Sequence, residues 1–175
     1  MTRTNAEAAL ELDESLAAAH ERVWQRLGNC GTWWTGSERV EAISEARQAL
    51  TCSLCSERSE ALSPVMVSGE HDSISNLPPA AIDFVHRLTT DPGRLSEQWA
   101  SQVIESITEE AYVELATVIS TQYVIDSFAR CLGLPLRDLP KAGDGMPDRI
   151  RPDGVGDVGA WVSQTIDKSL ANVSR

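Results

Sequence analysis

Two cysteines separated by two residues, Cys52 and Cys55, are the side chains in this sequence best suited to chemistry. We predict a helix over residues 51–62, and positions i and i+3 of a helix share a face, so both sulfur atoms can point the same way. Free N–H groups and the positive end of the helix dipole favour a thiolate there, which is the reactive form of cysteine. Such a pair can cycle between dithiol and disulfide through a sulfenic acid.

The same spacing has two other interpretations. A Cys-x-x-Cys pair is half of a tetrahedral zinc site, which needs two further ligands. Cys30 and Cys131 are available, but neither belongs to a second Cys-x-x-Cys pair or to a His-x-x-x-His pair, so we expect no metal ligand. Free cysteines are also among the most buried residue types, so the pair could be two small apolar side chains without chemistry.

A thiol redox pair works best beside a proton acceptor or donor, and the sequence offers several. Glu45 lies one predicted helix before the pair and could act as a base if it is buried, whereas Glu41 is more simply interpreted as solvated. His71, in a predicted loop beside an aspartate, and His86, on a predicted helix, are the histidine candidates. The alternative for both histidines is a purely structural role. The candidate catalytic residues are therefore Cys52, Cys55, Glu45, His71 and His86.

The elements that must position these residues are predicted to be helices. No stretch shows the apolar alternation of a β-strand, so the fold class is all-α. Gly28 and Gly133 end two of the helices, and Pro64 ends the one that carries the cysteines. The predicted helices cover residues 5–27, 37–49, 51–62, 79–88, 95–105 and 107–132.

Helix starts and core faces can also be predicted. Thr35 and Glu38 are three residues apart and form a predicted capping box, and Ser106 with Glu109 forms another before the longest helix. The apolar stripe of that longest helix is predicted to consist of Ala111, Leu115, Val118, Ile119, Tyr123, Val124, Phe128 and Leu132.

The composition changes after Pro135. Residues 138–158 hold three prolines, four glycines and five aspartates among few apolar residues, which predicts an extended segment. Residues 158–171 could form a short helix. We assign residues 1–137 to one helical domain and residues 138–175 to an irregular C-terminal tail that belongs to the same domain.

Charge and composition exclude some classes of partner. The 175-residue chain has a formal net charge of −11, so we expect neither nucleic acid nor an anionic membrane surface as a partner. No apolar run is long enough to span a bilayer, and acidic residues interrupt the N-terminal region where a signal peptide would need apolar ones. We therefore expect a cytoplasmic protein, in which four cysteines do not form a disulfide scaffold.

Several runs resemble the alkylhydroperoxidase D / carboxymuconolactone decarboxylase superfamily, and its alkylhydroperoxidase-related branch in particular. These runs are WWTGSERV (33–40), AR (46–47), CSLCSER (52–58), ALSP (61–64), DPGRL (91–95) and LGLP (132–135). The resemblance spans residues 22–137 and implies an AhpD-like helical bundle that assembles as a dimer or trimer. It also implies a thiol peroxidase or thiol-disulfide oxidoreductase that acts on a hydroperoxide or disulfide, uses a thiol reductant and needs no organic cofactor. By the same analogy, Cys55 attacks and Cys52 resolves.

The sequence departs from the proton relay of that family. The family pattern places a glutamate twelve positions before the first cysteine and a histidine four positions after the second, and these positions are Val40 and Ser59 here. Valine cannot carry a proton and serine is a poor base. Two alternatives to an oxidoreductase follow. One is a non-enzymatic helical protein that has lost the relay, and the other is a carboxymuconolactone decarboxylase-like lyase, which needs no cysteine pair.

Overall fold

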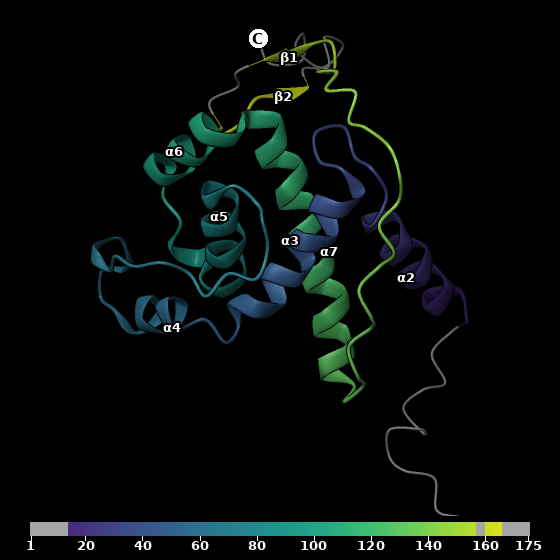
Figure 1. Ribbon diagram of the computed structural model, residues 1–175, viewed down its shortest axis with the longest axis horizontal. Coiled ribbons are helices and arrows are strands. Elements are labelled where there is room, and N and C mark those ends of the chain that lie inside the picture. The colour runs from purple at the N-terminus through teal and green to yellow at the C-terminus, as the bar shows by residue number, and fades with distance from the viewer. Residues whose placement is uncertain (1–13, 157–159, 166–175) are drawn as a thin grey trace, which may run out of the picture.

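The computed structural model describes residues 14–156 and 160–165, and this part of the chain is mostly helical (Figure 1). Its six α-helices confirm the predicted all-α class, and none of them is both long and apolar enough to cross a membrane. The helices are α2 (Glu14–Leu27), α3 (Gly36–Ala49), α4 (Ser53–Glu60), α5 (Pro79–Thr90), α6 (Glu97–Ile107) and α7 (Glu109–Cys131). Short 3-10 helices, η1 (Pro64–Met66) and η2 (Pro92–Arg94), flank α5, and the strands β1 (Val155–Gly156) and β2 (Gln164–Thr165) form one antiparallel pair.

The core lies where α3, α5 and α7 pack against one another. Its centre is formed by fully buried side chains from all three helices, namely Ile43, Phe84, Leu115 and Ile119. Helix α4 contains Cys55 and directly follows Cys52; it lies at the edge of the bundle and packs against α5 and η1 (Figure 1). The site is therefore built between a short peripheral helix and the central helices.

The helix starts follow the predicted capping in one case and differ from it in another. Thr35 caps α3 as predicted: its hydroxyl oxygen accepts from the Glu38 N–H at 3.2 Å, and the Glu38 carboxylate accepts from the Thr35 N–H at 2.8 Å. The predicted cap at Ser106 is wrong, because Ser106 lies within α6 and donates to a carbonyl of that helix. Thr108 caps α7 instead, with its hydroxyl accepting from the Ala111 N–H and its backbone at φ +79°.

The predicted apolar stripe of α7 is correct only in the first half of the helix. Ile119 is buried, but Tyr123 and Val124, which were predicted to be in the core, are exposed. Asp126 is buried instead, at 1% exposure. Arg47 of α3 compensates its charge with two hydrogen bonds of 2.9 Å to the two carboxylate oxygens. A buried ion pair therefore takes the place of an apolar contact between α3 and α7.

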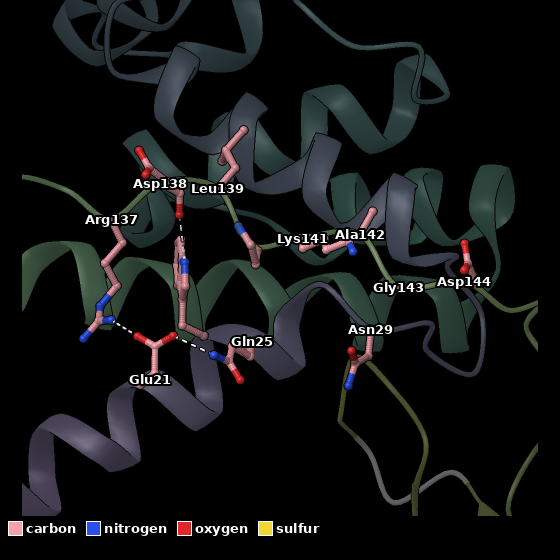
Figure 2. Close-up of a pocket in the computed structure, with 12 residues that line it drawn as sticks. Glu21, Gln25, Asn29, Arg137, Asp138, Leu139, Lys141, Ala142, Gly143 and Asp144 are labelled. Carbon is pink, nitrogen blue, oxygen red and sulfur yellow. Dashed lines mark hydrogen bonds and ion pairs between the residues drawn. The ribbon is translucent and has the colours of Figure 1, made fainter.

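The irregular C-terminal tail is present, and it lies along the helical body. Residues 134–152 contain no helix or strand, and Figure 2 shows their first part passing beside α2. The indole N–H of Trp24 donates to the Asp138 carbonyl oxygen at 2.9 Å, and Arg137 forms an ion pair with Glu21. These contacts attach the tail to α2 over the first residues after the last helix.

Two predicted helices extend beyond the described residues. The first, predicted over 5–27, is confirmed for Glu14–Leu27, and residues 5–13 lie outside the described part. The short helix predicted over 158–171 is wrong where it can be compared, since residues 160–162 form a bend and Gln164–Thr165 is strand β2. The pairing of β2 with β1 provides these residues with backbone hydrogen bonds that a helix would otherwise have supplied.

Candidate active site

The two cysteines occupy the first turn of α4. Cys52 is the N-cap residue and Cys55 follows within the helix, and their side chains are 2% and 3% exposed. The Cys52 side chain does not cap the helix; the Asp72 carboxylate does so instead, by accepting from the Ser53 N–H at 2.7 Å and from the Ser53 hydroxyl at 2.8 Å. The Asp72 N–H in turn donates to the Cys52 sulfur at 3.4 Å. The loop that caps the helix thus also donates a hydrogen bond to the Cys52 sulfur, and neither sulfur is used for capping.

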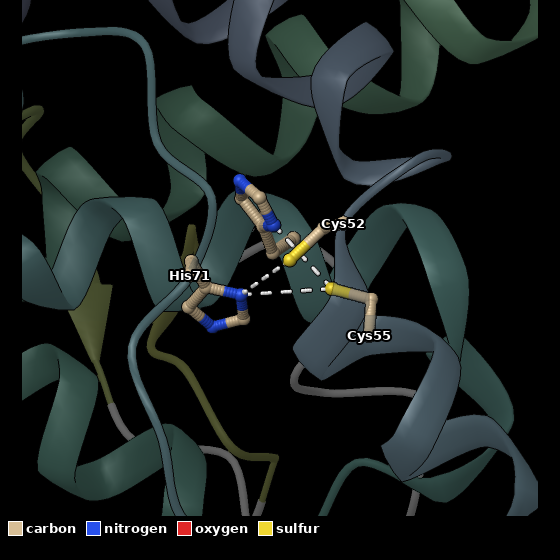
Figure 3. A group of neighbouring side chains, drawn as sticks. Cys52, Cys55 and His71 are labelled. Atoms are coloured by element: carbon tan, nitrogen blue, oxygen red, sulfur yellow. Dashed lines mark hydrogen bonds between the residues drawn. The ribbon is translucent and has the colours of Figure 1, made fainter.

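Two histidine rings face the sulfurs. Nδ1 of His71 lies 3.6 Å from the sulfur of Cys52 and 3.6 Å from that of Cys55, and Figure 3 shows this ring directed at both. Nδ1 of His86 lies 3.3 Å from the Cys55 sulfur. The two imidazole ring centres are 4.2 Å apart. His71 comes from the loop before α5 and His86 from α5 itself, so three separate parts of the chain meet here.

A buried carboxylate orients His86. Nε2 of His86 lies 2.9 Å from a carboxylate oxygen of Glu45, and both side chains are fully buried. The other Glu45 oxygen accepts three hydrogen bonds of 2.6–2.7 Å from residues 73–75. Burial alone would raise the pKa of Glu45, but these hydrogen bonds outweigh it and lower the pKa to about 2. Burial lowers the pKa of His86, so a neutral ring can donate from Nε2 to Glu45 and present the Nδ1 lone pair to Cys55.

A second carboxylate orients His71. Nε2 of His71 lies 3.0 Å from an oxygen of Asp83, which also accepts from Arg58 at 2.9 Å, and Arg87 lies 3.5 Å from the same oxygen. The Trp99 indole N–H donates to the other Asp83 oxygen at 2.7 Å. Burial raises the pKa of Asp83, but these partners hold it well below its usual range. Burial likewise lowers the pKa of His71, but its contacts with Asp83 and the two sulfurs outweigh this effect and raise it to about 10.

The environment of Cys52 favours its thiolate. Burial raises the pKa of Cys52, but hydrogen bonds from the Asp72 and Cys55 N–H groups and from His71 lower it overall. The two N–H groups are those expected at the start of a helix and its capping loop. Cys52 and His71 can therefore form a thiolate–imidazolium pair.

A cavity of about 440 Å³ gives access to the cysteines. Its lining includes Cys52, Cys55 and the exposed Tyr123 of α7. The volume is suited to a small molecule rather than to a folded partner. A larger cavity, of about 760 Å³, lies between α2 and residues 137–144 (Figure 2) and is lined by none of the site residues.

The structure brings all five predicted site residues into one cluster: Cys52, Cys55, Glu45, His71 and His86. The expectation of no metal ligand rests on Cys30 and Cys131 as the two possible further ligands. Those two lie elsewhere: Cys131 is exposed, and the Cys30 thiol contacts the carbonyl oxygens of Gly31 and Trp34. The two histidines instead complete a set of four possible ligand atoms, all within 4.8 Å of one another.

Two residues of the site were not predicted from the sequence. Asp83 orients His71, and Arg58 pairs with Asp83, yet neither was a candidate. Asp83 lies three residues before His86 and four before Arg87 on one predicted helix, and this spacing was the available signal.

Glu41, interpreted as solvated, accepts from the Asn76 N–H at 3.1 Å.

No protein-family model, no curated protein and no solved structure matches this chain. The chemistry of the site therefore has to be inferred from the geometry of its own residues.

Proposed function

We propose that this protein is a thiol-dependent oxidoreductase of the peroxidase type, similar to the alkylhydroperoxidase D group, in which Cys52 and Cys55 cycle between dithiol and disulfide. One observation carries the proposal: Cys55 Sγ lies 3.3 Å from His86 Nδ1, and His86 Nε2 lies 2.9 Å from the buried Glu45 carboxylate. A nucleophile, a base and a group that orients the base form the arrangement that activates a thiol.

This arrangement compensates for the departure from the family relay. Val40 cannot carry a proton and Ser59 is a poor base, but Glu45 and His86 supply the same two types of side chain from other positions. The non-enzymatic alternative rested on the absence of those side chains. The proposed relay therefore removes the main argument for that alternative.

The first step oxidises one sulfur. His86 accepts the Cys55 thiol proton, and the thiolate attacks an oxygen of the hydroperoxide, which breaks the O–O bond. The sulfur keeps one oxygen as a sulfenic acid, and the other oxygen leaves as an alkoxide that takes a proton from the adjacent imidazolium to give an alcohol. Two electrons pass from sulfur to oxygen in this step.

The second step forms the disulfide. The Cys52 thiolate attacks the sulfenic sulfur of Cys55, and the hydroxide leaves as water after it receives a proton from His71, which lies 3.6 Å from both sulfurs. The sum is one hydroperoxide and two thiols giving one alcohol, one water and one disulfide. A small thiol, which the cavity can admit, returns two electrons to the disulfide and completes the cycle.

Exposure and volume favour a small hydroperoxide over a protein disulfide as the oxidant. The two sulfurs are only 2% and 3% exposed, and the cavity that leads to them holds about 440 Å³. A small molecule fits this space, whereas a disulfide on a folded protein would have to displace parts of α4 or α7 to reach the sulfurs.

Thiol titration of the reduced, metal-free protein with and without hydrogen peroxide tests the proposal. We expect the protein to lose two of its four thiols, and this paired loss to disappear in Cys52→Ser and Cys55→Ser. Cys131→Ser is the matched control: it removes an exposed thiol outside the site, and the remaining protein should still lose two. Wild-type thiols that do not react would contradict the proposal and favour the non-enzymatic alternative.

The same variants test the order of attack. In Cys52→Ser, the sulfenic acid at Cys55 has no resolving thiol, so a sulfenic-acid reagent such as dimedone should label Cys55. Labelling of Cys52 in Cys55→Ser, with none of Cys55 in Cys52→Ser, would reverse the proposed roles.

A further inference from the structure

The four atoms that face one another in this site have the composition and spacing of a zinc site. The sulfurs of Cys52 and Cys55 and the Nδ1 atoms of His71 and His86 all lie within 4.8 Å of one another. Tetrahedral zinc, with Zn–S of about 2.3 Å and Zn–N of about 2.0–2.1 Å, places sulfur and nitrogen ligands about 3.6 Å apart. Three sulfur–nitrogen distances in the site are 3.6, 3.6 and 3.3 Å.

Outer hydrogen bonds prepare both histidines as ligands. Nε2 of His86 lies 2.9 Å from Glu45, and Nε2 of His71 lies 3.0 Å from Asp83. A histidine that binds zinc commonly donates its other ring N–H to a carboxylate, which fixes the ring and directs the remaining lone pair at the metal. Two independent rings in this site have that arrangement, and both direct Nδ1 at the sulfurs.

The position of His71 also suits a bound metal ion. Its Nδ1 is equally distant from the two sulfurs, at 3.6 Å from each. A metal ion at the centre of the four atoms would bind both sulfurs and both nitrogens at once. Two thiolates and two neutral imidazoles would also neutralise a divalent cation, which suits a buried site.

We propose that Cys52, Cys55, His71 and His86 form a four-coordinate Zn²⁺ site, and that zinc bound there inhibits the thiol chemistry. The metal site stands on its own geometry, and the inhibition rests on the proposed function. Zinc takes the lone pairs of both thiolates and of His86 Nδ1, so neither a free nucleophile nor a free base remains. Slow oxidation would convert the zinc dithiolate, one hydroperoxide and two protons into the disulfide, an alcohol, water and free Zn²⁺.

Metal titration tests the site. The reduced protein, stripped with a chelator, is titrated with Zn²⁺ alone in competition with a chromophoric chelator, and with Co²⁺, whose visible absorption reports a tetrahedral thiolate site. We expect one metal ion per chain. Loss of an outer partner of a zinc ligand typically costs about 10–100-fold in affinity, so Cys52→Ser and His71→Asn, which remove ligands, should cost more than this.

Matched controls come from the same residue types outside the cluster. Cys131→Ser removes an exposed cysteine, and His20→Gln removes a histidine that packs on Phe128. Both should bind zinc as the wild type does. Circular dichroism establishes that each variant is folded, and His71, at the edge of the site, gives a second variant if Cys52→Ser is unfolded. Absence of binding by the wild type, or equal losses in the controls and the ligand variants, would overturn the site.

The rate of thiol loss with hydrogen peroxide tests the inhibition. We expect the rate to fall as zinc occupancy rises and to return when the metal is chelated; a rate that does not depend on bound zinc would overturn this part. The two proposals fail separately. Metal-free protein that reacts but never binds zinc refutes the metal site alone, whereas protein that binds zinc but is inert when metal-free refutes the redox function alone.

Discussion

At the scale of single residues, Glu45 is the side chain whose charge matters most for the proposed relay. Glu45→Gln keeps an oxygen for the three donors of residues 73–75 but places an amide N–H opposite His86 Nε2. His86 must then carry its proton on Nδ1, so Cys55 loses its base. We expect the rate of thiol oxidation by hydrogen peroxide to fall by about 100-fold or more, measured on the metal-free protein.

Glu41→Gln is the control for that prediction. Glu41 lies one turn earlier on α3. Within the part of the chain that the structure describes, its carboxylate accepts one hydrogen bond, from the Asn76 N–H. The substitution is chemically the same but does not touch His86, so the oxidation rate should stay at the wild-type value. Equal rates in the two variants would show that the Glu45 carboxylate has no part in the relay.

Asp83 is the residue whose substitution should cost most in stability around the site. It pairs with Arg58, Arg87 and His71 and accepts from Trp99, so Asp83→Asn leaves three cationic groups poorly compensated. We expect the free energy of unfolding in urea to fall by about 2–3 kcal/mol at neutral pH. Asp91→Asn, which breaks a surface pair with Arg94, should cost less than about 1 kcal/mol.

The stability difference between the wild type and Asp83→Asn should depend on pH in one direction. Because the folded protein holds the pKa of Asp83 below the ordinary value of 3.8, its contribution to stability is present above that pH and is lost as the pH falls further. Wild type and Asp83→Asn should therefore become more alike in urea stability below pH 3.8. A difference that stays constant across this range would show that the carboxylate charge is not what stabilises the protein.

The sequence predicts the members of the site better than their arrangement. The relation of Cys52 to Cys55 is local, because one helical turn sets it. The contacts of His71 and His86 with these sulfurs depend on the path of the loop before α5 and on how α5 packs, and no local pattern encodes either. The spacing of Asp83 to Arg87 indicates an ion pair within one helix, but its contacts with Arg58 and His71 depend on the same packing of distant parts of the chain.

At the scale of elements, the start of α3 depends on a close approach between backbones. A Cβ atom at Gly36 would lie 2.4 Å from the carbonyl oxygens of both Gly28 and Gly143. The Gly143 N–H also donates to the Gly28 carbonyl at 2.8 Å, so the C-terminal tail is attached at this point. Gly36→Ala should destabilise the protein by about 1–3 kcal/mol and increase hydrogen exchange at the Gly143 amide.

Gly93→Ala provides the comparison, because a Cβ atom there would meet nothing within 4 Å. Its stability and exchange should match those of the wild type. If Gly36→Ala also behaves as the wild type does, the tail does not depend on the close approach at α3.

The second half of α7 shows why the predicted core face was displaced. The helical period that passes through Leu115 and Ile119 continues to Gln122 and Asp126, and both are buried. The apolar pattern of the sequence favours Tyr123 instead, because a buried polar residue has no hydrophobic signal. Gln122 on the same helix donates to the Asp126 carboxylate at 2.7 Å, and Arg47 of α3, which is distant in the sequence, compensates its charge.

At the scale of the whole molecule, apolar periodicity correctly predicts an all-α class. It does not predict the path of the tail, which is fixed by contacts such as that between Trp24 and the Asp138 carbonyl rather than by any apolar pattern. The spacing of apolar residues along a helix is a local property of the sequence. The docking of an irregular segment depends instead on partners more than a hundred residues away.

Zinc should change the stability of the whole protein, because its four proposed ligands join α4, the loop before α5, and α5 itself. At a free zinc concentration 100-fold above the dissociation constant, binding to the folded state alone adds about 2.7 kcal/mol. For a chain of this size, we expect Tm to rise by roughly 5–10 °C in the reduced protein. The oxidised protein, which lacks thiolates, should show little change. Equal Tm values for the reduced protein with zinc and with chelator would contradict the expectation.

The most direct test of the redox account is to map the cysteines after the reduced, metal-free protein has reacted with one equivalent of hydroperoxide. The two possible causes of reactivity predict opposite results. If exposure decided which thiol reacts, the exposed Cys131 would be oxidised first, whereas the proposed relay makes the buried Cys52 and Cys55 react first. If the His86–Glu45 relay activates the pair, peptide mapping by mass spectrometry will find the Cys52–Cys55 disulfide first, with Cys30 and Cys131 still reduced. Oxidation of Cys131 while the pair remains a dithiol would contradict the account.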